Sequence, residues 1–161
     1  MGEGAAALRP AAAGGVRLRR RDETPAGGAP GGRLDLRFPG GDALRWQWRP
    51  GRGYARSQAG APFTQAPEGA QVTCDNVLVQ LVGVRASGFV DTAGAPVPES
   101  LVVGGEQAWL LRDGRWFTGR WAKPDLRAVT SFTGADGRPL PLRPGRTWIE
   151  ILPHGGTATV T

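Results

Sequence analysis

The feature that most constrains the fold of this chain is a series of short alternating segments separated by turn residues. Apolar and polar residues alternate over residues 33–38 and again over residues 44–49, on either side of the sequence PGGD (39–42). A period of two places the apolar side chains on one face of a strand. Matched alternating strands around turn residues predict a β-hairpin.

Later segments extend this pattern. Residues 77–82 form the most continuously apolar stretch, with Gln80 as their one polar residue, and they are rich in β-branched side chains, which favours a central strand over a helix. Asp113-Gly114 and Asp136-Gly137 each separate two apolar runs and predict further tight turns. Residues 91–100 are rich in turn formers, and a strand is expected to begin at Leu101.

No stretch after residue 31 holds a helical period without a Gly or Pro break. The expected fold is therefore mainly β: a single antiparallel sandwich or partly open barrel-like domain with a disordered N-terminal arm.

Composition divides the chain into three parts. Residues 1–31 consist largely of Ala, Gly, Pro and Arg and are predicted to be a disordered arm or linker, because they offer almost no large apolar groups for a core. Residues 32–154 carry the strand pattern and are predicted to form the β domain. Residues 155–161 are predicted to be a polar tail.

The charge of the chain allows two interpretations. Lys and Arg number 20 against 14 acidic residues, and Lys123 is the only lysine. A basic chain often binds nucleic acid or another anionic surface. A compositional bias toward Ala, Gly, Pro and Arg explains the charge as well and is favoured, because the arginines are scattered and only residues 17–21 form a cluster.

No catalytic or metal-binding constellation is evident in the sequence. Cys74 and His154 are each the only residue of their type, so an internal disulfide and the usual zinc motifs are excluded. The carboxylates show no paired spacing, and the Gly-Gly-Glu at 104–106 lacks the pattern of a phosphate-binding loop. We therefore expect no enzyme activity, no metal and no cofactor.

The six tryptophans are the most informative aromatic residues. Most are expected in the core, since each indole can bury roughly 200 Å². One domain rarely buries six indoles completely, however. An exposed tryptophan beside a cation would suit glycans, peptides or single-stranded nucleic acid.

Several segments together resemble the C-terminal domain of the YerB-like lipoproteins, a bacterial family of unknown function. They are DNVLVQ (75–80), the hairpin ending in GRWAK (119–123), and DGRPLPLRPGRTWIEILP (136–153). Tyr54 and Arg56 lie where the family usually has a Tyr-x-Arg, and the resemblance runs from about residue 33 to residue 153. One departure is the loop after Arg56, where the family often has His and Asp and this chain has Phe63-Thr64-Gln65.

The resemblance implies a location at the cell envelope, lipid-anchored in an intact form, with a further N-terminal domain. This chain by itself shows no signal-peptide pattern and no apolar run long enough to cross a bilayer, so it reads as soluble and as a truncated gene product.

Two hypotheses for function follow. The first is a non-catalytic binding domain for a cell-wall polymer, a peptide or an envelope protein. Its candidate ligand-binding residues are Arg56, Asn76, Trp121, Lys123 and Trp148. The alternative is a basic domain that binds single-stranded nucleic acid through the aromatic residues of its sheet and the arginines at 17–21.

Overall fold

The computed structural model describes residues 27–67, 69–140 and 142–161. The chain forms the following strands in this part: β1 (Ala29–Pro30), β2 (Arg33–Arg37), β3 (Ala43–Arg49), β4 (Gly53–Gln58), β5 (Ala61–Pro62), β6 (Thr73–Cys74), β7 (Asn76–Val82), β8 (Val84–Val90), β9 (Pro96–Ser100), β10 (Gly104–Arg112), β11 (Arg115–Lys123), β12 (Ser131–Gly134), β13 (Thr147–Pro153) and β14 (Thr157–Val160). None of the described residues forms a helix, so no helix there is long and apolar enough to cross a membrane.

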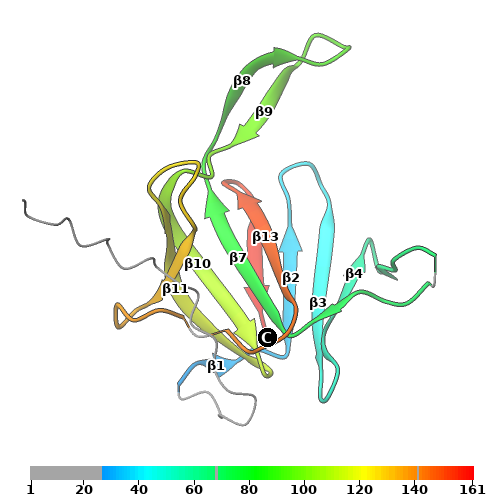
Figure 1. Ribbon diagram of the computed structural model, residues 1–161. Helices are drawn as coiled ribbons and strands as arrows, with labels where there is room; N and C mark the ends of the chain where they lie inside the picture. Colours follow the sequence, from blue (N-terminus) through cyan, green and yellow to red (C-terminus); the bar gives the residue numbers. More distant parts are fainter. Residues whose placement is uncertain (1–26, 68, 141) are drawn as a thin grey trace, which may run out of the picture.

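The strands form two larger sheets and one separate hairpin (Figure 1). The β7 sheet has the order β1-β11-β10-β7-β13, with β12 added beside β11. The β3 sheet has the order β14-β2-β3-β4-β5, with β6 added beside β4. β8 and β9 pair only with each other, and their hairpin projects away from the two sheets. The expectation of a mainly β, mainly antiparallel domain is confirmed, although β13 pairs with β7 in parallel.

The core lies between the two sheets because the alternating strands turn their apolar faces toward each other. On β2 and β3 the inward residues Leu34, Leu36 and Trp46 are at most 1% exposed. They pack in one cluster with Val77 and Val79 of the central strand β7. β7 is also buried on its other face, where Leu78 packs against Leu110, Leu140 and Leu142. Burial on both faces explains why residues 77–82 are apolar at every position except Gln80.

The turns follow the local sequence. β2 and β3 form the expected hairpin around residues 39–42. β10 and β11 pair in register around Asp113 and Gly114, whose φ angles are 52° and 69°. Positive φ at both central residues is typical of the tight turn that matches the twist of the strands. Gly137 also has positive φ, at 74°.

The structure differs from the sequence-based expectation in residues 84–103. Residues 96–100 form β9 and pair with β8, whereas residues 101–103 lie outside any strand. Pro96 and Pro98 suggested a loop because proline cannot donate a hydrogen bond to a sheet. In a two-stranded ribbon each strand is an edge strand, and a proline is tolerated where its nitrogen faces away from the partner.

The domain also extends further at both ends than expected. Ala29 and Pro30, assigned to the arm, form β1 and pair with Trp116 and Arg115. Residues 157–160, assigned to a polar tail, form β14 and pair with β2. Each of these short strands lies at the edge of its sheet and pairs with a strand that is distant in the sequence. Such pairing leaves little pattern in the local sequence from which a strand could be predicted. The remainder of the predicted arm, residues 1–26, lies outside the described residues.

Candidate functional site

The five candidate ligand-binding residues do not gather on one surface. Arg56 and Trp148 lie together between the two sheets, with the guanidinium carbon of Arg56 5.2 Å from the centre of the Trp148 ring. Asn76 is completely buried at the start of β7. Trp121 and Lys123 lie on β11, at its far end from β1. The five residues therefore belong to three separate parts of the structure.

Arg56 is held in an aromatic cluster on the inner side of β4. Its guanidinium carbon lies 4.0 Å from the centre of the Phe63 ring, and Phe63 and Trp148 make an edge-on contact at 6.4 Å. Arg56 as a whole is 7% exposed. Phe63 comes from the loop in which the resembled family often has polar residues, so in this chain the loop supplies an aromatic ring to cover Arg56.

The counter-charge of Arg56 is Glu150 of β13, in the opposite sheet. Arg56 Nε lies 3.6 Å from Glu150 Oε1, a separation that makes an ion pair without a hydrogen bond. Trp46 Nε1 donates a hydrogen bond of 2.8 Å to the same oxygen. Burial raises the pKa of the Glu150 carboxyl, and the Trp46 indole and the positive charge of Arg56 offset this only in part. The Arg56–Glu150 pair therefore links the two sheets. The charge of the Glu150 carboxylate is buried, and its neighbours compensate the cost of burial only in part.

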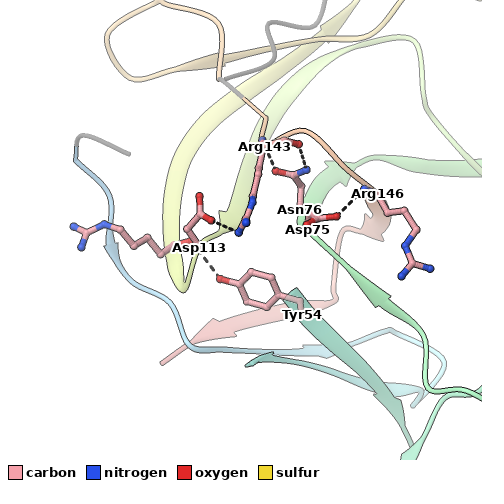
Figure 2. A network of polar contacts seen from close by, with 7 residues as sticks. Tyr54, Asp75, Asn76, Asp113, Arg143 and Arg146 are labelled. Carbon is pink, nitrogen blue, oxygen red and sulfur yellow. Dashed lines mark hydrogen bonds and ion pairs between the residues drawn. The ribbon is translucent and has the colours of Figure 1, made fainter. Parts of the chain in front are cut away.

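Asn76 fastens the loop before β13 to the start of β7 (Figure 2). Its Nδ2 donates to the carbonyl oxygen of Arg143 at 2.8 Å and to Thr147 Oγ1 at 3.1 Å. Its Oδ1 accepts from the backbone N–H of Arg143 at 2.8 Å. Asp75 holds the same loop, because its Oδ2 accepts from the backbone N–H of Arg146. The Asp-Asn pair of the DNVLVQ segment thus fixes loop geometry from within the molecule.

Trp121 is also engaged in the interior. It is 2% exposed, and its Nε1 donates a hydrogen bond of 2.7 Å to the carbonyl oxygen of Leu81. It packs with Val82 and Ala108 in a cluster of its own. Lys123, two residues further along β11, is half-buried.

The residues considered for catalysis have ordinary structural positions. Cys74 is 4% exposed, and burial raises the pKa of its thiol to about 12. His154 Nε2 lies 2.7 Å from Glu106 Oε1 in an exposed pair on the surface. The described part of the chain contains no group of three or more His, Cys, Asp or Glu residues placed to hold a metal ion.

The sequence analysis missed a surface on the outer side of the β3 sheet. Because the inner side of β2 and β3 is apolar, the alternate residues point outward. We call this surface the arginine face; it consists of Arg33, Asp35 and Arg37 on β2, Arg45, Gln47 and Arg49 on β3, and Thr157 and Thr159 on β14. It presents four guanidinium groups and one carboxylate, with no aromatic ring.

One carboxylate organises two of these arginines. Asp35 contacts Arg33 Nε at 2.8 Å and Arg45 Nε at 2.7 Å, the latter as a hydrogen bond. Among the described residues, no acidic side chain forms an ion pair with Arg37 or Arg49, and both arginines are exposed. The face therefore keeps an excess of positive charge. The signal was present in the sequence, as two arginines four residues apart in each of two strands, but without the pairing of the strands it could not be told from a compositional bias.

Comparisons with known proteins agree with this architecture. Residues 34–149 match the C-terminal domain of DUF3048, described as a protein of unknown function. No curated protein matches the chain. The crystal structure of the YerB protein from Bacillus subtilis is similar, with a TM-score of 0.62 and 19% sequence identity over 78% of this chain.

The similarity to YerB covers only part of that protein. The chain spans 43% of the YerB chain, and at this identity the likeness concerns the fold alone. The family match covers most of the two-sheet domain, from β2 into β13. It includes the Tyr54, Arg56 and Asn76 positions that hold the sheets and the loop together. The chain therefore belongs to the family of DUF3048 C-terminal domains.

Proposed function

We propose that this chain is a non-catalytic binding domain of the cell envelope that holds an anionic, phosphate-containing wall polymer on the arginine face. The observation that carries the proposal is the excess of guanidinium groups on an exposed, regular sheet surface. Guanidinium groups bind phosphate oxygens with two parallel hydrogen bonds, and they retain their charge at any physiological pH.

The geometry of the face suits an extended polymer. Arg33 and Arg37 lie four residues apart on β2, and Arg45 and Arg49 lie four residues apart on β3. At roughly 3.3 Å per residue, each pair spans about 13 Å along the strand. Successive phosphates of one polymer can therefore meet guanidinium groups from both strands without any change in the fold.

The same face supports a wall polymer better than single-stranded nucleic acid. Proteins that bind single strands without sequence preference use aromatic rings on which the bases stack. Here Trp46 is 0% exposed and Trp121 is 2% exposed, and the other four tryptophans are half-buried. A polymer that has phosphates but no bases needs guanidinium groups and no aromatic rings, and the arginine face provides such a surface.

Two further points support the non-catalytic and envelope parts of the proposal. The Cys74 thiol is buried with a raised pKa, which disfavours the thiolate form that a nucleophile requires. The envelope location rests on the resemblance to the YerB-like lipoproteins and places the domain where anionic wall polymers occur.

The test is a titration of the full chain with poly(glycerol phosphate) of defined length. Binding is monitored by fluorescence anisotropy at about 50 and 200 mM salt. We expect affinity that falls steeply with salt, because bound phosphates release counterions. The double variant R37E/R49E should bind at least about tenfold more weakly, with a smaller salt slope. Within the described part of the chain neither side chain has an ion pair to lose, so the fold should be retained.

The matched control is R127E/R138E, which makes the same change in net charge at exposed positions away from the arginine face. It should bind nearly as well as the wild type. Equal loss in the two double variants would show that only net charge matters and would overturn the proposal. Much tighter binding of a dT oligonucleotide, per phosphate, would overturn it in favour of nucleic acid.

A further inference from the structure

The arginines of the arginine face follow one another in a regular order, which the pairing of β2 with β3 determines. The two strands run side by side (Figure 1), and residues 43, 45, 47 and 49 of β3 mark four levels along them. On β2, Arg37 lies opposite Ala43 and Arg33 lies opposite Gln47. The other two levels are occupied by arginines of β3 itself. Each level therefore carries one arginine, in the order Arg37, Arg45, Arg33 and Arg49.

The levels are evenly spaced because they follow the pleat of the sheet. Outward side chains recur at every second residue, and a strand rises roughly 3.3 Å per residue, so successive levels lie about 7 Å apart. The arginines come alternately from β2 and β3, and neighbouring strands lie about 4.8 Å apart. A polymer that lies along the two strands therefore meets one arginine about every 7 Å, from alternate sides.

Asp35 restrains the two middle arginines of this row. It lies opposite Arg45, and its two carboxylate oxygens contact different arginines: Oδ1 contacts Arg45 and Oδ2 contacts Arg33. The side chains of Arg45 and Arg33 are still 52% and 42% exposed, so both remain accessible to a ligand. A charged contact to one shared carboxylate keeps the two guanidinium groups near the middle of the row. Arg37 and Arg49 lie exposed at its two ends.

The spacing of the levels favours one length of linker between phosphates. Two residues of a strand contain six backbone bonds and span about 7 Å. Two phosphorus atoms joined through a three-carbon unit, as in poly(glycerol phosphate), are also separated by six bonds and, when extended, by about the same distance. A five-carbon unit has eight bonds and extends to about 9 Å, so over the three steps of the row its phosphates drift from the arginines by roughly one level.

We propose that the arginine face recognises the spacing of its polymer and selects phosphodiesters joined by three-carbon units. This inference rests on the proposed function and adds a selectivity to it. Four consecutive phosphates of such a polymer match the four levels, with one guanidinium group for each phosphate. A five-carbon polymer must bend at every linker to make the same contacts, and the ordering of each linker lowers the affinity.

The test compares two fluorescently labelled oligomers, each with four phosphates, in which the linkers are propane-1,3-diol or pentane-1,5-diol. Binding to the full chain is measured by fluorescence anisotropy at about 50 mM salt. The two oligomers carry the same charge, so an attraction that depends on net charge alone would give equal affinities. We expect the three-carbon oligomer to bind at least about fivefold more tightly.

A rearranged variant tests the order of the arginines at constant net charge. Q47R/R49Q moves one arginine from the end of the row to the level that Arg33 already occupies. It should bind the three-carbon oligomer at least about threefold more weakly, with a salt slope smaller by about one phosphate contact. Q47A is the matched control, because it loses the same hydrogen bond to the carbonyl oxygen of Gly32 without moving an arginine. It should bind like the wild type.

Two outcomes would overturn this inference and leave the proposed function intact: equal binding of the two oligomers, or equal affinities of Q47R/R49Q and Q47A. Absence of binding to both oligomers would overturn the proposed function and this inference with it. A nucleic-acid strand also has six bonds between successive phosphorus atoms, and the titration with a dT oligonucleotide distinguishes it from a polymer without bases.

Discussion

Asn76, Arg56 and Glu150 are polar yet buried, and each meets partners that are distant in the sequence. Asn76 bonds to residues 143 and 147, while Arg56 and Glu150 face each other from opposite sheets. A buried amide or charge without such partners would be costly. The polar positions shared with the YerB-like pattern are therefore accounted for by the fold, while the arginine face consists of ordinary strand residues.

The pH dependence of stability should report on Glu150. Because the pKa of this carboxyl is raised by folding, the folded state binds its proton more tightly than the unfolded state. Its contribution to stability is fully present below the ordinary value of about 4.5 and is lost as pH rises through the folded-state pKa. In E150Q this part of the pH dependence should disappear.

Urea unfolding of wild type and E150Q between about pH 4 and 8 provides the measurement. The wild type should lose stability relative to E150Q as pH rises. A gain relative to E150Q would mean that the attraction of Arg56 outweighs burial. Glutamine keeps an oxygen that can accept from the Trp46 indole, so the comparison isolates the charge.

At the scale of single elements, the sequence was most informative where the residues of a turn have a specific backbone preference. The β10–β11 hairpin follows from Asp113-Gly114, because positive φ at both positions suits this dipeptide. The β8–β9 hairpin was missed, because Pro96 and Pro98 carry the opposite local signal. Only the pairing of Val84 with Ser100 and of its neighbours shows that these prolines lie in a strand.

Gly114 should tolerate substitution less well than Gly137. Both have positive φ, which disfavours alanine by about 1 kcal/mol. At Gly114 an added Cβ would also lie 2.9 Å from Trp48 Cδ1, whereas at Gly137 it would meet nothing within 4 Å. G114A should therefore lower the free energy of unfolding more than G137A does, as measured by urea titration. Equal effects would show that Trp48 moves aside without cost.

At the scale of the whole molecule, the ends of the described chain help to complete the domain. The hydroxyl of Tyr54, in the core, donates a hydrogen bond of 2.8 Å to the carbonyl oxygen of Gly31, next to β1. Gly31 also bonds through its N–H to the carbonyl oxygen of Gly114. Residues 27–31 thus link the β3 sheet to the β10–β11 turn.

Deleting residues 1–31 should lower the urea midpoint of unfolding, because it removes β1 and the acceptor of the Tyr54 hydroxyl. Comparison with a chain lacking only residues 1–26 assigns the effect to residues 27–31. Y54F in the full chain should show part of the loss, about 1 kcal/mol for one buried hydrogen bond. An unchanged midpoint in the shorter chain would mean that β1 contributes nothing to stability.

The sequence by itself determined the class of fold, the central strand and most of the hairpins. These features depend on contacts between near neighbours in the chain: alternation decides which face is apolar, and Asp-Gly pairs decide where strands reverse. The tertiary structure decided which strands meet across the two sheets, and with them the Arg56–Glu150 pair, the Asn76 contacts and the arginine face. All of these join residues far apart in the sequence, and no local pattern specifies which distant strand will be the neighbour.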